Sequence, residues 1–287
     1  YKKRMLKAKQ EYERKPTEEL KRDISKFNNV QMARKIQLNS AYGAIGNQYF
    51  RYYNLANAEA ITLSGQVAIR WIENKVNNYL NKVLQTDGED YVIASDTDSI
   101  YLNLGPLVQA VFPSGEKDDQ STLSFLKKVC DVELDRYIAS SYEEMATYVN
   151  AYEQKMVMKR ENIANKGIWT AKKRYILNVW NSEGVQYDKP KLKMMGIEAV
   201  KSSTPMPCRT AIKEALNVIM TGSENDTQKY IKDFREKFEK MSPEEVAFPR
   251  GCNNIAKNTS SATIYGKGCP MHVRGALLYN FYIKKRK

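Results

Sequence analysis

The stretch YVIASDTDSIYLNL, residues 91–104, places two apolar, β-prone runs around Ser-Asp-Thr-Asp-Ser. This pattern predicts an antiparallel hairpin with Asp96 and Asp98 at its tip. Residues two apart on an extended strand face the same side, so the two carboxylates could face one point. At ~4 Å and an effective dielectric of 20 they would repel by ~4 kcal/mol. An oxygen-liganded cation such as Mg²⁺ would relieve that repulsion; a turn with solvated aspartates is the alternative.

The charge balance favours a polyanionic partner. The chain has 287 residues, with 46 Lys and Arg against 33 Asp and Glu, a formal charge of +13 and a pI near 9.3. Nucleic acid comes first among polyanions, although a protein with a merely basic surface would show the same balance. The length allows two domains, or one large domain with an appendage.

Cysteine usage indicates an intracellular protein. The four cysteines show no close pairing, and the single histidine, His272, argues against a Cys/His zinc site. Free thiols are expected in a reducing compartment, the cytoplasm, or the host cytoplasm if the protein is viral. No apolar run approaches the ~20 residues of a membrane span, so no membrane partner is expected. Because the first residue is Tyr rather than Met, we expect the chain to begin inside a larger polypeptide.

The rest of the sequence predicts an α+β fold, with an antiparallel sheet that carries helices on one face. Pro16 breaks a helical hairpin, and Thr17 caps its second helix, which should run from about Glu18 to Gly43. Turns are expected in residues 105–121, a boundary near 200, and an irregular C-terminal tail. The other predicted elements are helices at 54–84, 123–149, 207–221 and 226–241, and two or three strands within 155–180.

The segment RKIQLNSAYGAIGN, residues 34–47, predicts a ligand-binding helix face. Lys35, Asn39 and Tyr42 follow one another at helical spacing, so they share one face. A lysine, an asparagine and a tyrosine in that order suit a phosphate, a sugar edge and a base. A solvated helix with incidental polar residues is the alternative.

A second basic segment is WTAKKRYILNVW, residues 169–180. Lys172, Lys173 and Arg174 lie in a strand-like run, and Lys173 should share a strand face with Tyr175. Basic and aromatic side chains on one face suit a nucleic-acid backbone and base edges. The alternative is the charged outer face of an edge strand, which discourages aggregation.

Three motifs occur in a fixed order: K-x-x-x-N-S-x-Y-G from Lys35, D-T-D-S from Asp96 and K-x-Y from Lys173. In this order they resemble the family B DNA polymerases, in particular the replicative branch of large tailed bacteriophages. The resemblance covers nearly the whole chain. It implies a partial helical-hairpin fingers element over residues 1–46, a palm with an antiparallel sheet and packed helices over 47–196, and a partial, mainly helical thumb over 197–287.

The resemblance also implies roles for individual residues in the fingers. Lys35 would bind the incoming deoxynucleoside triphosphate and so assist catalysis. Asn39 would support that site, and Tyr42 would pack under the nascent base pair. Lys2 matches a second triphosphate-binding lysine.

In the palm, the resemblance implies a catalytic site with two Mg²⁺ ions. Asp98 would be the stronger metal ligand, Asp96 would shape the site through water, and Glu161 would be a further carboxylate near the metals. Lys173 and Tyr175 would touch the primer end. The complete set of implied DNA contacts is Lys173, Tyr175, Thr97, Lys172, Arg174, Ser202 and Ser203.

The implied function is template-directed DNA synthesis, in which a primer 3′-hydroxyl attacks a deoxynucleoside triphosphate. The family's first catalytic aspartate, in a D-x-x-S-L-Y-P segment, has no match in this sequence, and Lys159 stands where phage relatives carry an acidic residue. The implied partners are therefore primer–template DNA, dNTP, an N-terminal polymerase portion that carries that aspartate and an exonuclease, and a sliding clamp bound through segments that this chain lacks.

Two other functions are compatible with parts of the sequence. A polymerase-derived, non-catalytic DNA-binding scaffold would keep the fold, but it would have no need of Lys35, Asp98 and Lys173 together. A polymerase of the reverse-transcriptase type shares the palm chemistry, but the K-x-x-x-N-S-x-Y-G helix argues against it.

Overall fold

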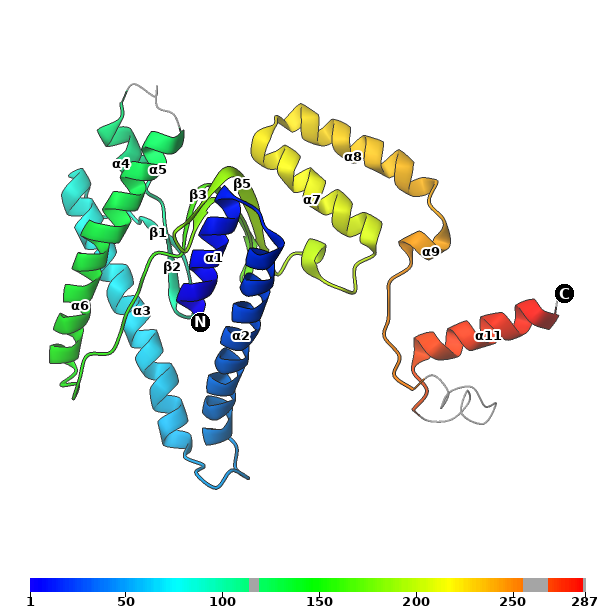
Figure 1. The fold of residues 1–287 in the computed structure, drawn as a ribbon, viewed down its shortest axis with the longest axis horizontal. Coiled ribbons are helices and arrows are strands. Elements are labelled where there is room, and N and C mark those ends of the chain that lie inside the picture. Colours follow the sequence, from blue (N-terminus) through cyan, green and yellow to red (C-terminus); the bar gives the residue numbers. More distant parts are fainter. Residues whose placement is uncertain (114–118, 255–267, 286–287) are drawn as a thin grey trace. The chain divides into compact units, whose positions relative to one another are not determined.

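A computed structural model describes residues 1–113, 119–254 and 268–285, and Figure 1 shows the order of their elements. The chain forms two compact units. The first comprises Tyr1–Gly167 with Leu177–Lys193, and the second Ile168–Ile176 with Met194–Lys287. In the described part of the chain, no helix combines the length and the apolar character that a membrane crossing needs.

The chain starts with the predicted helical hairpin, made of α1 (Lys2–Arg14) and α2 (Glu18–Ile45). The Thr17 hydroxyl accepts a hydrogen bond from the backbone N–H of Leu20 at 3.2 Å, which confirms the predicted N-cap. No residue of α2 is buried, so this helix is solvated along its length.

The core of the first unit lies between α3 (Leu55–Leu84) and α6 (Asp135–Tyr148). The buried α3 side chains recur every four residues and form the stripe of an amphipathic helix. The core residues of α3 are Ala68, Ile72, Val76 and Leu80, and those facing them are Tyr91, Leu134, Ile138, Tyr142 and Met145. The apolar spacing of residues 54–84 predicts such a stripe, although it also includes Ile61 and Val67, which are about half exposed.

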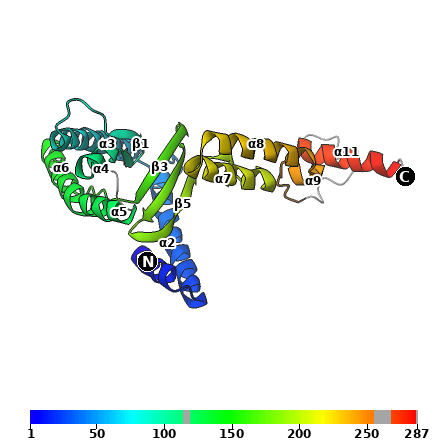
Figure 2. The same ribbon diagram turned by 90° about the horizontal axis from the view of Figure 1, so that it is seen from above.

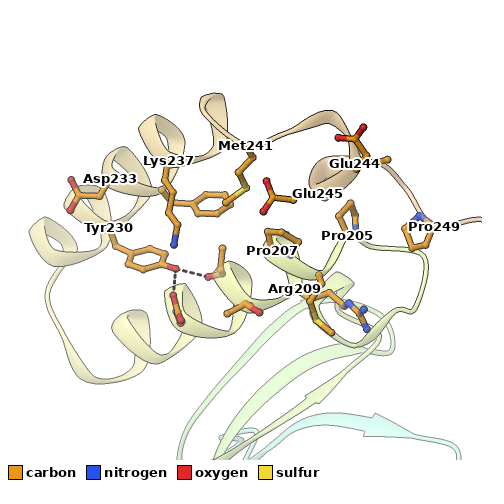
Figure 3. A pocket seen from close by; sticks show the side chains of 16 residues that line it. Pro205, Pro207, Arg209, Tyr230, Asp233, Lys237, Met241, Glu244, Glu245 and Pro249 are labelled. Carbon is orange, nitrogen blue, oxygen red and sulfur yellow. Dashed lines mark hydrogen bonds between the residues drawn. The ribbon is translucent and has the colours of Figure 1, made fainter. Parts of the chain in front are cut away.

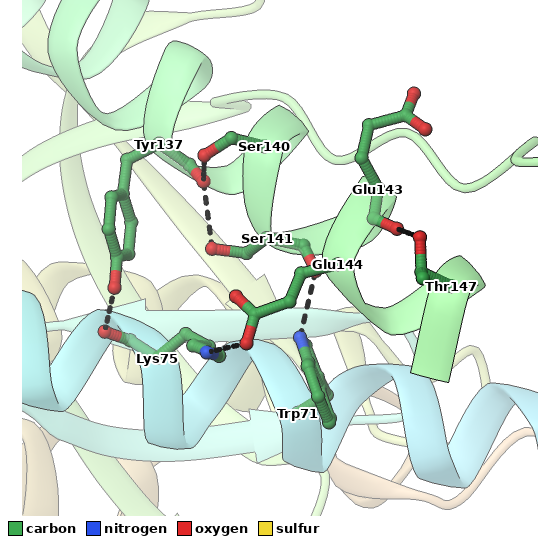
Figure 4. A network of polar contacts seen from close by, with 8 residues as sticks. All are labelled: Trp71, Lys75, Tyr137, Ser140, Ser141, Glu143, Glu144 and Thr147. Atoms are coloured by element: carbon green, nitrogen blue, oxygen red, sulfur yellow. Dashed lines mark hydrogen bonds and ion pairs between the residues drawn. The ribbon is translucent and has the colours of Figure 1, made fainter. Parts of the chain in front are cut away.

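Polar contacts join the same two helices along the edge of the core (Figure 4). The Trp71 indole N–H donates to the Ser141 carbonyl at 2.8 Å, and the Tyr137 hydroxyl donates to the Lys75 carbonyl at 3.2 Å. The Lys75 ammonium pairs with Glu144 at 2.5 Å. These bonds fix the rotation of α3 against α6.

The segment between β2 and α6 differs from its prediction. Turns were expected at Gly105–Val111, but this segment forms helix α4, which buries Leu107. Proline is tolerated in the first turn of a helix because its missing N–H would have no partner there. The predicted helix at 123–149 begins earlier and consists of α5 (Asp119–Lys128), the π-helix η1 (Val129–Leu134) and α6. Residues 114–118 of the predicted turn lie outside the described residues.

The strands form two antiparallel sheets rather than the single predicted sheet. The first pairs β1 (Val92–Asp96) with β2 (Ser99–Leu102). The second has the order β3 (Asn162–Ala171), β4 (Arg174–Ser182), β5 (Val185–Met195), with two-residue connections. The α+β class is confirmed. Strand β5 lies beyond the range in which strands were predicted.

Helices dominate the second unit. After η2 (Glu198–Val200), helices α7 (Met206–Thr221) and α8 (Glu224–Glu239) lie side by side, as Figure 2 shows, and α9 (Pro243–Val246) follows. The tail was predicted to be irregular, but α11 (Met271–Lys285) is helical because apolar helix formers follow Pro270. Residues 255–267 of that tail lie outside the described residues.

The α3 stripe makes a stability prediction with a matched control. Ile72 is 0% exposed and Ile61 is 53% exposed on the same helix. We expect Ile72→Ala to lower the free energy of unfolding by ~2–5 kcal/mol, because it leaves a cavity in the core. Ile61→Ala should change it by less than ~0.5 kcal/mol. Urea unfolding followed by tryptophan fluorescence measures both, and equal losses would contradict this description of the core.

Candidate functional site

The hairpin tip holds its two aspartates differently from each other. Asp96 is the last residue of β1 and is partly buried, whereas Asp98 is exposed in the turn. Thr97 has a φ of 58°, and the Asp98 N–H donates to the Asp96 carbonyl at 2.7 Å. The strand therefore ends at Asp96, so the predicted same-side geometry of an extended strand does not apply. The Thr97 hydroxyl donates to the Asp96 carboxylate at 2.9 Å.

Two asparagines of α3, which the sequence analysis missed, position this hairpin. The Asn77 side-chain oxygen accepts from the backbone N–H groups of Tyr91 and Val92, at 2.9 and 3.1 Å. One turn later, the Asn81 amide bonds the backbone of Glu89 as both donor and acceptor, at 2.7 and 3.0 Å. Their four-residue spacing on the helix was the available signal.

The hairpin supplies two carboxylates, but the residues that the structure describes bring no three His, Cys, Asp or Glu side chains together as a metal site. The Glu161 carboxylate lies 4.0 Å from the Lys193 ammonium. Mg²⁺ commonly uses one or two protein carboxylates and completes its shell with water and substrate phosphates. Asp96 and Asp98 therefore fit Mg²⁺ as a donor set that needs oxygens from a substrate.

The α1–α2 groove, a cavity of about 310 Å³, brings together three of the residues predicted to bind a nucleotide. Its lining residues are Tyr1, Lys2, Gln31, Arg34, Lys35, Leu38 and Asn39. Tyr42, predicted with them, lies one turn beyond the groove and is 42% exposed. The lining includes three cationic side chains and no carboxylate, so the groove suits a polyphosphate.

The basic segment of the second unit is a turn rather than a strand face. Lys172 and Lys173 connect β3 to β4, and Lys173 has a φ of 62°. Tyr175 is only 8% exposed, and its ring stacks on Trp169 with centroids 6.2 Å apart. Lys173 and Tyr175 therefore do not share a strand face, because the strand starts after the lysine.

Two further sets of predicted DNA contacts are Arg174, which directly follows this turn, and the serines ahead of α7. The Arg174 guanidinium pairs with the Glu198 carboxylate. The pKa of Glu198 lies below its usual range, first because its own backbone N–H bonds the carboxylate and then because of Lys201 and Arg174. Ser202 and Ser203 are exposed just before α7.

A larger cavity of about 810 Å³ lies among α7, α8 and α9 (Figure 3). None of the predicted site residues lines it, and its charged lining has four carboxylates and two cations. Within it the Tyr230 hydroxyl donates to the Glu214 carboxylate at 2.7 Å. Burial, and then that bond, raises the pKa of Tyr230 to about 12. An acidic lining does not suit a phosphate, so this cavity is not the candidate site.

Comparison with known proteins agrees with the motif analysis. Residues 2–135 match the family described as DNA polymerase family B. The DNA-directed DNA polymerase of Escherichia phage RB69 is 44% identical over 263 residues, which are 89% of this chain and 29% of that protein. The DNA-directed DNA polymerase of Enterobacteria phage T4 is 38% identical over 270 residues, 91% of this chain and 30% of that protein. These matches confirm the resemblance, and the chain spans less than a third of either relative.

The close packing of Gly196 against the Lys173 turn leads to a prediction about stability. Gly196 has a φ of 67°, and a Cβ there would lie 2.3 Å from the Lys173 carbonyl oxygen. Gly196→Ala should therefore lower the free energy of unfolding in two ways: by ~1–2 kcal/mol because alanine is strained in a left-handed conformation, and by a further ~1–3 kcal/mol because its Cβ overpacks the site. Gly88→Ala, in the first unit, is the control, because its φ is 70° and a Cβ there would meet nothing within 4 Å. Urea unfolding measures both, and equal losses would argue against close packing behind Lys173.

Proposed function

This chain is a homologue of part of the family B DNA polymerases, and from that premise we propose that it carries the nucleotide-adding step of template-directed DNA synthesis. The supporting observation is the groove that gathers Lys2, Lys35 and Asn39 with no carboxylate in its lining. Residues 1–46 would act as fingers, 47–196 as palm and 197–287 as part of the thumb.

In the proposed reaction the α1–α2 groove holds the triphosphate. The ammonium groups of Lys2 and Lys35 would neutralise its charge, and the Asn39 amide would orient it by hydrogen bonds. Tyr42, exposed one turn further along α2, would offer its ring to the new base pair. Positioning and charge neutralisation are the main contributions that a protein makes to phosphoryl transfer.

Asp98 and Asp96 would hold Mg²⁺ at the hairpin tip, with Asp98 as the direct ligand because it is exposed. Two bound Mg²⁺ ions would lower the pKa of the primer hydroxyl and stabilise the leaving pyrophosphate. The bond from Thr97 would keep the Asp96 carboxylate oriented at the edge of that site. Glu161 would contribute through its charge.

Duplex DNA would be bound mainly through its phosphates. Lys172 and Lys173 form an exposed turn, and Ser202 and Ser203 offer hydroxyls before α7. Such contacts do not depend on base sequence and weaken with added salt. Tyr175 would support the turn from below. The first catalytic aspartate would come from another part of the polymerase, because the D-x-x-S-L-Y-P segment has no match in this sequence.

The first test removes the proposed metal ligand. Mixed with an N-terminal portion that carries the D-x-x-S-L-Y-P aspartate, the chain should extend a primer in the presence of Mg²⁺. Asp98→Ala should lower extension by ~100-fold or more, because a metal contributes several kcal/mol to the transition state. Primer–template affinity should stay nearly constant. Asp87→Ala, at an exposed aspartate ahead of the hairpin, should leave extension unchanged; full extension by Asp98→Ala would refute the role.

The second test concerns the groove. Lys35→Ala should raise the apparent KM for dNTP by ~10-fold, which is the effect of losing one charge-assisted contact. Lys21→Ala is the matched control, because Lys21 lies on the same helix, pairs with Glu18 at 3.2 Å and does not line the groove. Single-nucleotide incorporation over a dNTP series measures both. An unchanged KM in Lys35→Ala would remove this lysine from the triphosphate site.

A further inference from the structure

The β4–β5 turn of the first unit is held rigidly. Glu183 and Gly184 form it with φ values of 50° and 86°, the left-handed pair of a type I′ hairpin turn. The Glu183 N–H donates to the Glu161 carbonyl, and the Gly184 N–H donates to the Asn181 side-chain oxygen at 3.2 Å. Both central N–H groups of the turn are thereby bonded.

A partly buried guanidinium fixes the base of this turn. Arg160 is only 10% exposed, and it donates to the Asn181 oxygen at 2.8 Å. Its other nitrogens bond both carboxylate oxygens of Asp131, at 2.8 and 3.1 Å. Asn181 itself is 1% exposed. A bidentate pair of this kind has a defined geometry, so the turn is presented at a fixed place.

Helix α1 makes two polar contacts with this turn and one with strand β5. The Lys2 ammonium is 2.6 Å from the Glu183 carboxylate, and the Gln10 amide donates to the Gly184 carbonyl at 3.1 Å. Further along, Glu13 pairs with Lys191 of β5 at 2.6 Å. At 100° per residue, positions 2, 10 and 13 fall within about 80° of one another, so one face of α1 makes all three contacts.

Lys2 thus faces two anion sites. It lines the α1–α2 groove, and its ammonium is paired with a carboxylate that is not part of the groove lining. The Glu183 side chain is 27% exposed and that of Lys2 is 56% exposed. Because Glu183 sits on the pinned turn and Lys2 has a flexible four-carbon stem, the lysine is the partner that can move.

We propose that Glu183 is the counter-ion of Lys2 when the groove is empty, and that a polyphosphate must displace it to engage Lys2. This inference rests on the proposed function of the groove. Glu183 would then set how readily the site takes up a triphosphate, since the carboxylate and the phosphate compete for one ammonium. It would also couple nucleotide entry to release of the first turn of α1 from the β4–β5 turn.

The test titrates this chain with inorganic tripolyphosphate at low ionic strength, by calorimetry. Glu183→Gln keeps the shape and removes the charge, so the dissociation constant should fall about two- to fivefold, the range that an exposed ion pair supports. Lys2→Ala should weaken binding. In the double variant Lys2→Ala/Glu183→Gln, the gain should vanish, because the effect of Glu183 requires Lys2.

The matched control is Glu13→Gln, which breaks another α1 ion pair without touching Lys2 and should leave the affinity unchanged. An equal gain in Glu13→Gln would show that loosening α1 suffices, and it would overturn the counter-ion role. No gain, or a loss, in Glu183→Gln would overturn it too. Thermal unfolding checks that each variant folds, and Glu183→Ala serves as a second charge-removing variant.

Lys35→Ala separates this inference from the function on which it rests. Weaker binding in Lys35→Ala with no response to Glu183→Gln would refute the counter-ion and leave the groove as the triphosphate site. Unchanged binding in both Lys35→Ala and Lys2→Ala would refute the groove itself.

Discussion

The hydrogen bonds from the Asn77 side chain to the start of β1 connect the core to the proposed chemistry. Asn77 follows Val76, which is 0% exposed, so packing of α3 against α6 fixes where the amide points. Its oxygen satisfies the N–H groups of Tyr91 and Val92, and the ring of Tyr91 returns to the same core. An unsatisfied buried N–H would cost ~1–3 kcal/mol. One side chain therefore sets where β1 begins and, four residues later, where Asp96 lies.

The first unit has a cationic groove and, outside the groove lining, a carboxylate that pairs with one of its lysines. The groove contributes Lys2, Arg34 and Lys35 and holds no acid of its own. Repulsion among these cations would be largest with no anion present, and the pair with Glu183 reduces it. The carboxylate comes from the β4–β5 turn, so fold and charge are linked: the turn that joins two strands of the second sheet also carries the counter-ion of Lys2.

The sequence alone could predict the elements that are determined by residues close together in the chain. The Thr17 cap, the α3 stripe and the motif spacing on α2 each depend on neighbours within one or two turns, and each could be predicted. The gathering of Lys2 with Lys35 and Asn39 was predicted only through family resemblance, because no local pattern relates residues more than thirty apart. Arg160 and Asn181 were missed, since their importance arises from a tertiary contact between β4 and η1.

Errors arose where a residue adopts a backbone conformation that its type disfavours. Thr97, Lys173 and Glu183 all have positive φ, and each was assigned to, or lay beyond, a run that looked extended. Left-handed backbone in such residues costs ~1–3 kcal/mol and persists only when the surroundings impose it. Each of the three sits in a two-residue connection between strands, and each carries or adjoins a proposed ligand contact: metal, DNA and the Lys2 counter-ion. These turns thus place their side chains beyond the ends of the strands, whereas a regular strand would place them on a face of the sheet.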